Sequence, residues 1–135
     1  MATIRKEIEI NASAAEVWDV VRDLGAIHTR FVPGFVTDTM LEEEARIVTF
    51  ETGLVVRELF VDLDDKARRF AYAVVGGGMS HHNASMQVFP EAEDRCRLVW
   101  ITDLLPNEAA ISISAMVDRG SAIMKTTLDR PRMAG

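Results

Sequence analysis

Apolar and polar residues alternate at the start of the chain. Residues 3–10 (TIRKEIEI) place their isoleucines on one face and most of their charged side chains on the other. A period of two matches the pleat of a β-strand, in which successive side chains point to opposite faces. This pattern predicts a half-buried first strand.

The alternation returns between residues 34 and 105 in short runs that turn residues separate. The breaks fall at residues 42–44 (EEE), 52–53 (TG), 64–66 (DDK), 76–78 (GGG) and 91–94 (EAED). Runs joined by such short turns pair as hairpins and are therefore antiparallel. This region predicts about six consecutive strands, which makes seven with the first.

Two short helical segments are expected between the first strand and this series. Ser13 followed by Glu16 forms a capping box before an apolar run, so a helix should begin at Ser13 and end near residues 23–25. Residues 26–31 predict a second short helical or looped piece, which stops at residues 32–34 (VPG).

A long helical pattern follows residues 106–108 (PNE). Its apolar face consists of Ile113, Met116, Val117, Gly120, Met124 and Leu128, at intervals of three and four. A helix of about 22 residues is about 33 Å long, close to the length of a ten-residue strand at about 3.3 Å per residue. The helix can therefore lie along the whole sheet.

Composition narrows the class of protein. The chain has 135 residues of which 48% are apolar, enough for a single domain over residues 1–135 with one core. The formal charge is -6 and the 15 basic residues are scattered, which argues against nucleic-acid binding. Neither an apolar signal core nor a run long enough to span a bilayer occurs, so a cytoplasmic location is expected. Cys96 is the single cysteine and is interpreted as a structural thiol.

The order of one strand, two short helices, six strands and a long helix resembles the helix-grip fold of the START-like (SRPBCC) superfamily, which includes polyketide cyclases/dehydrases and lipid-transfer proteins. The resemblance spans nearly the whole chain. Its local carriers are residues 14–21 (AAEVWDVV), 32–34 (VPG), 57–58 (RE), 63–65 (LDD), 68–69 (RR), 74–77 (VVGG), 88–90 (VFP) and 99–100 (VW). It implies an α+β fold in which a seven-stranded curved antiparallel sheet wraps around the C-terminal helix.

The resemblance also implies a cavity between the sheet and the last helix. With Trp100 and Ala84 placed on the concave face, the parity of each strand selects its inward residues. The expected ligand-binding residues are Val56, Glu58, Phe60, Tyr72, Val74, His82, Ala84, Met86, Trp100, Thr102, Met116, Val117, Gly120 and Met124. The register of residues 54–62 stays open, because the other face of that strand is equally apolar.

Glu58 is the most informative candidate, since a carboxylate on an apolar face needs a partner or marks a functional site. A structural role would pair it with Arg57, Lys66 or another surface base. A functional role would have it contact a ligand. In an enzyme, Glu58, His82 or Tyr72 would move a proton.

Two other features carry no site on this interpretation. His81 and His82 are adjacent in a strand and face opposite sides, so a metal site is not expected. Residues 76–78 (GGG) lie between two strands and lack the features of a phosphate loop, and no cofactor is expected.

The leading hypothesis is a module that binds a small hydrophobic molecule such as a lipid, a polyketide or a similar aromatic or isoprenoid metabolite. The alternative is a polyketide cyclase/dehydrase-type enzyme that uses the same cavity. A homodimer, and an interaction module acting through the loops near residues 33–34 and 76–78, both remain open.

Overall fold

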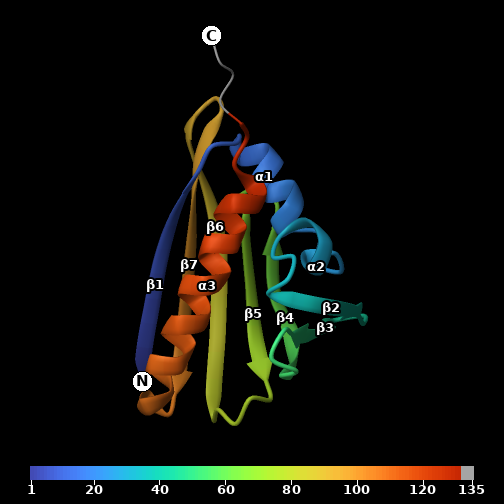
Figure 1. The fold of residues 1–135 in the computed structure, drawn as a ribbon, viewed down its shortest axis with the longest axis vertical. Coiled ribbons are helices and arrows are strands. Elements are labelled where there is room, and N and C mark those ends of the chain that lie inside the picture. The colour runs from blue at the N-terminus through green and yellow to red at the C-terminus, as the bar shows by residue number, and fades with distance from the viewer. Residues whose placement is uncertain (132–135) are drawn as a thin grey trace.

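The computed structural model describes residues 1–131 (Figure 1). Its strands are β1 (Ala2–Ile10), β2 (Val36–Leu41), β3 (Ala45–Phe50), β4 (Val55–Asp64), β5 (Arg69–Val75), β6 (His81–Ala92) and β7 (Arg95–Leu105). Its helices are α1 (Ala14–Val21), α2 (Ile27–Arg30), a 3-10 turn at Asn107–Ala109 and α3 (Ala110–Leu128). The predicted order of elements is confirmed.

The seven strands form one antiparallel sheet in the order β1-β7-β6-β5-β4-β3-β2. Strands β2 to β7 follow one another as hairpins, as predicted. Strand β1 returns to pair with β7 over its whole length, from Ala2 opposite Leu104 to Ile10 opposite Cys96. The first and last strands of the chain are therefore neighbours, and the sheet curves around α3 (Figure 1).

Helix α1 is fixed at both of its ends. Ser13 caps it, because the Ser13 Oγ accepts the Glu16 backbone N–H at 3.1 Å. Near the other end the Trp18 indole N–H donates to Asp65 at 2.9 Å, and Arg22 pairs with the same carboxylate at 2.7 Å. Asp65 lies in the turn between β4 and β5, so this turn holds α1 over one end of the sheet.

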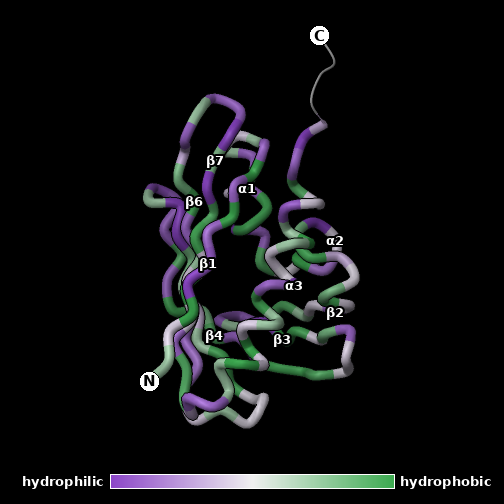
Figure 2. Tube along the Cα trace, turned by 60° about the vertical axis from the view of Figure 1, so that its left-hand side comes forward, coloured by the Kyte–Doolittle hydropathy of each residue, from purple (hydrophilic) through white to green (hydrophobic). Residues whose placement is uncertain are grey.

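Helix α3 crosses the concave face and packs along β1 (Figure 1). In the view of Figure 2, β1, β6 and β7 lie on one side and α2 and α3 on the other. Its end is tied to the end of β1: the Asn11 backbone N–H donates to Asp129 at 2.8 Å, and the Arg130 backbone N–H donates to the Asn11 carbonyl at 2.7 Å. On the other side, Arg119 pairs with Glu51 in the β3–β4 turn at 2.5 Å.

Burial along β4 resolves the register that the sequence left open. Val56 and Glu58 are 6% and 7% exposed, whereas Val55 and Val61 are 51% and 61% exposed. The face that carries Glu58 is therefore the concave one. The parity expected for β5, β6 and β7 is likewise observed, with Tyr72, Ala84 and Thr102 buried on the same side.

The core is densely filled at the end of the sheet that α1 covers. Val17, Val21, Val88 and Leu98 are all at most 2% exposed there. Cys96 is fully buried in this region, and burial together with the nearby Glu9 raises the pKa of its thiol to about 11. A thiol in this state is a structural residue rather than a nucleophile.

Candidate functional site

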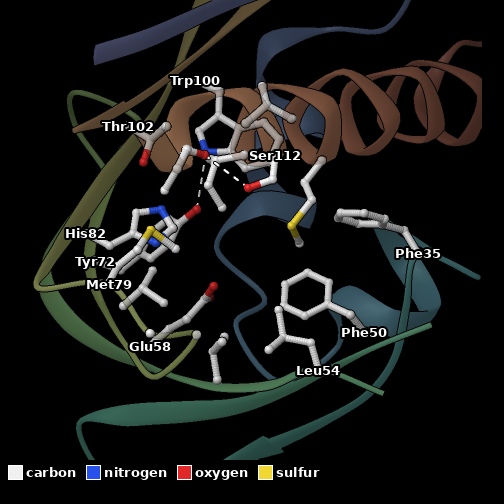
Figure 3. A pocket seen from close by; sticks show the side chains of 18 of the residues that line it. Phe35, Phe50, Leu54, Glu58, Tyr72, Met79, His82, Trp100, Thr102 and Ser112 are labelled. Carbon is white, nitrogen blue, oxygen red and sulfur yellow. Dashed lines mark hydrogen bonds between the residues drawn. The ribbon is translucent and has the colours of Figure 1, made fainter. Parts of the chain in front are cut away.

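A cavity of about 260 Å³ lies at the other end of the sheet, between its concave face and the first half of α3 (Figure 3). The wall on α3 consists of Ser112, Ile113, Met116 and Val117. The sheet supplies most of the remainder, together with the loops that follow β3, β5 and β7. The polar side chains in the wall are Glu58, Tyr72, His82, Trp100, Thr102 and Ser112.

The mouth of the cavity includes the loop between β5 and β6. Gly76, Gly77 and Gly78 all have positive φ angles, of 106°, 73° and 77°. Only glycine adopts this backbone without strain, so the run of three glycines is explained by the shape of the loop. Gly77, Gly78 and Met79 line the cavity, opposite Leu54 and Pro106.

A second, smaller chamber of about 50 Å³ lies deeper in the molecule. It shares five wall residues with the main cavity: Phe35, Phe50, Glu58, Tyr72 and Trp100. Arg46, Met86 and Met124 line the inner chamber but not the main cavity. The five side chains that line both spaces therefore form a partition between the main cavity and the inner chamber.

The structure places nine of the expected ligand-binding residues at the wall of the main cavity. They are Val56, Glu58, Tyr72, Val74, His82, Trp100, Thr102, Met116 and Val117. Met86 and Met124 line the inner chamber instead. Whether any of these residues contacts a ligand remains a prediction.

Three expected residues lie elsewhere, and this corrects the sequence interpretation. Phe60 sits beside a bulge in β4 and packs edge-on against Phe70, with ring centroids 5.7 Å apart. Ala84 is buried between its cross-strand neighbours Tyr72 and Thr102 and lines neither chamber.

Gly120 also lies behind the wall rather than in it. A Cβ atom at this position would be 3.1 Å from Phe35 Cε2 and 3.4 Å from Trp100 Cζ3. Both rings belong to the partition. The glycine therefore gives room to two aromatic side chains that line the cavity.

Glu58 forms a buried ion pair with Arg46. The Arg46 Nε donates to the Glu58 Oε1 at 2.7 Å, and the two residues are only 5% and 7% exposed. They are directly opposite each other on β3 and β4. The partner is thus neither Arg57, which pairs with Glu42 on the outer face at 2.8 Å, nor Lys66. The Glu58 carboxylate also points into the main cavity (Figure 3).

Arg46 is held by more than its partner. Its Nη1 donates to the Leu24 carbonyl at 3.2 Å, and its guanidinium lies over the rings of Phe70 and Tyr72, with the carbon 5.2 and 5.6 Å from their centroids. Cation–π contacts of this kind gain strength when they are shielded from water. The ion pair is therefore fixed in place by surrounding groups.

Tyr72 and Trp100 form a second polar group in the wall. The Trp100 Nε1–H donates to the Tyr72 hydroxyl oxygen at 3.2 Å (Figure 3). Burial raises the pKa of the Tyr72 phenol, and the Glu58 carboxylate raises it further. The hydroxyl therefore stays protonated at neutral pH and can donate a hydrogen bond.

His82 lies in the wall near Tyr72 (Figure 3). Burial lowers the pKa of its imidazole, and the adjacent His81 lowers it further, so the ring is neutral at pH 7. Its Nδ1 is buried and has no hydrogen-bond partner within residues 1–131. In the same part of the chain, no three His, Cys, Asp or Glu side chains are grouped so that they could hold a metal ion.

Sequence reasoning missed Arg46, Phe35 and Phe50. A signal for Arg46 was present, since a tight turn at residues 51–54 sets the β3–β4 register and places residue 46 opposite residue 58. Phe35 lies just before β2 in a segment without periodicity, so no pattern could place it.

No helix among the described residues is both long and apolar enough to cross a membrane.

The sequence matches a family of known proteins. The model of a family described as polyketide cyclase / dehydrase and lipid transport matches residues 1–129. No curated protein matches the sequence significantly.

Solved structures share the fold over nearly the whole chain. A solution structure from Thermobifida fusca is 28% identical and superposes with a TM-score of 0.78, covering 95% of this chain and 91% of that one. Truncated norcoclaurine synthase from Thalictrum flavum is 21% identical, with a TM-score of 0.68 and coverage of 96% and 95%. A START superfamily protein from Mycobacterium smegmatis is 11% identical, with a TM-score of 0.69 and coverage of 92% and 97%.

Proposed function

This chain belongs to the polyketide cyclase / dehydrase and lipid transport family, and we propose that it binds a small hydrophobic molecule in the cavity between its sheet and α3. The observation that carries the proposal is the cavity of about 260 Å³ with largely apolar walls and a few polar side chains. Such a combination is typical of small-molecule sites.

The arrangement of the wall supports this function. Leu54, Met79 and Ile113 are among its apolar residues, whereas Glu58 and Tyr72 belong to the partition at its inner side. Methionine side chains such as Met79 and Met116 adapt to the shape of a ligand. A molecule with an apolar body and one polar end would match both parts of this wall.

A cavity-filling substitution tests the proposal. Val74→Trp should place an indole in the main cavity and abolish binding of the neutral fluorescent probe N-phenyl-1-naphthylamine, with little loss of thermal stability. The matched control is Val75→Trp, because the neighbouring side chain points to the outer face and is 52% exposed. Fluorescence titration and thermal melts of both variants give the answer. Equal binding by Val74→Trp and the parent protein would contradict the proposal.

Catalysis is the second candidate function, and it is favoured by the grouping of a phenol, an imidazole and a carboxylate in one wall. Neutral His82 can accept a proton and Glu58 lies in the same wall, whereas burial makes the Tyr72 phenol a weaker acid. General acid–base groups of this kind contribute about 100-fold or more to rate.

Turnover of a cyclisable poly-keto substrate separates the carrier from the enzyme. If Glu58 transfers a proton, Glu58→Gln should lower turnover about 100-fold while affinity stays nearly constant. If Glu58 only orients a ligand, affinity should fall instead. Circular dichroism of the variant must accompany the assay, because the substitution leaves the buried Arg46 without its partner.

A further inference from the structure

The cavity walls carry no net charge, and this feature sharpens the proposed function on which the inference rests. Within residues 1–131, the charged side chains that line the two chambers are Arg46 and Glu58, and these form an ion pair with each other. His82 is neutral at pH 7 because burial disfavours its charged form. The charges in the wall therefore already cancel.

A charged ligand would find no counter-ion in such a site. Moving a carboxylate or an ammonium group out of water is strongly unfavourable unless an opposite charge compensates it. Arg46 is already engaged by Glu58 and by the Leu24 carbonyl. The walls of the two chambers therefore offer an ionised molecule no compensating charge.

The hydrogen-bonding groups of the wall define the expected ligand more closely than the net charge of the wall does. Glu58 uses Oε1 to accept from Arg46, and a carboxylate has further lone pairs for the cavity. Tyr72 accepts from Trp100, and its own proton has no acceptor within the described residues. Because Glu58 is paired with Val74 and Tyr72 with Phe60, the two residues are diagonal neighbours on one face of the sheet.

An acceptor beside a donor is the complement of a hydroxyl group, which donates one hydrogen bond and accepts others. We propose that the cavity selects an uncharged apolar molecule with a hydroxyl group at its inner end, which donates to Glu58 and accepts from Tyr72. Fatty-acid carboxylates and amines are excluded on this basis, although they would suit an apolar cavity of the same size.

Four naphthalene probes of similar size test the proposal by calorimetry and ligand-observed NMR at pH 7: 2-naphthol, naphthalene, 2-naphthoate and 2-naphthylmethylammonium. Hydrogen bonds to charged groups are worth about 1.5–3 kcal/mol, so 2-naphthol should bind about tenfold or more tightly than naphthalene. Both ions should bind more weakly than naphthalene. Binding of either ion as tight as that of 2-naphthol would overturn the inference and leave the proposed function intact. Failure of all four to bind would overturn both.

Two variants and one matched control test which residues give the selectivity between the probes. Glu58→Gln leaves the Arg46 guanidinium without its counter-ion, so 2-naphthoate should overtake 2-naphthol. Glu42→Gln is the matched control, because it breaks the equivalent Arg57 pair on the outer face and should leave the ranking unchanged. Tyr72→Phe, a milder change, should reduce the advantage of 2-naphthol over naphthalene without admitting the ions. An unchanged ranking in a folded Glu58→Gln protein would overturn the inference.

Discussion

The two ends of the concave face are built from the same strands and serve different purposes. At the end under α1, Val88 and Leu98 on β6 and β7 are 2% and 0% exposed within the apolar core. At the other end the same strands carry His82, Trp100 and Thr102, which line an open space. What differs is the cover: α1 lies directly on β6 and β7, whereas α3 packs along β1 and leaves the middle of the sheet free.

The comparison teaches where polar groups are tolerated. The packed end has no role for a polar side chain, because an unpaired polar group buried there would lose its hydration without return. The hollow end holds a carboxylate, a phenol and an imidazole, each held by a partner or open to the cavity. Substitutions at the two ends should therefore have different effects on stability and binding.

The largest effect is expected at the border between the two ends, where Arg46 and Glu58 form their ion pair. Arg46→Met leaves a buried carboxylate without its partner, which costs about 3–5 kcal/mol of unfolding free energy. The control Arg57→Met breaks an exposed pair and should cost about 1 kcal/mol or less. Urea unfolding at pH 7 measures both, and equal losses would show that burial of the first pair has no energetic consequence.

Next in size is a truncation at the packed end. Leu98→Ala removes a side chain that is 0% exposed, and such cavities cost about 2–5 kcal/mol. Val74→Ala at the hollow end should cost clearly less, because that side chain already borders empty space. Urea unfolding compares the two variants. A larger loss for Val74→Ala would show that the cavity is collapsed in solution.

A smaller effect is expected for Ala84→Trp. Ala84 is part of the buried core cluster and lines neither chamber, so an indole there should overfill the core and cost about 1–3 kcal/mol. The control is Asn83→Trp, since the adjacent side chain faces outward and is exposed. Thermal melts distinguish the variants. An unchanged melting temperature for Ala84→Trp would indicate that the hollow region extends further along β6 than the structure shows.

The smallest change in stability is expected for Gly120→Ala. Replacing a helical glycine with alanine gains about 1 kcal/mol, and the crowding of Phe35 at 3.1 Å opposes that gain. The net stability should stay within about 1 kcal/mol, while affinity for 2-naphthol changes because the partition moves. Ala122→Gly, on the exposed side of α3, reports the helix effect alone. Unchanged affinity in Gly120→Ala would mean that the partition does not contact the ligand.

The sequence was sufficient for the fold and for part of the site. With Trp100 and Ala84 taken as inward anchors from the family resemblance, the period-two alternation placed Thr102 and His82 on the concave face, because one anchored residue fixes the parity of a strand. It could not distinguish lining from packing: Ala84 has the correct parity but lines neither chamber. The partner of Glu58 was missed because the candidates were sought close in the sequence, whereas the β3–β4 register places Arg46 opposite Glu58.

The pairing of β1 with β7 has a consequence for the time course of folding. Thr3 and Asp103 are partners in the sheet, and Asn11 is bonded to Asp129 and Arg130. Contacts between residues this far apart form slowly, because a long loop must close before they stabilise anything. The hairpins from β2 to β7 are local and can form before β1 and α3 meet. We therefore expect the concave face to gain its cover, and the cavity to form, late in folding.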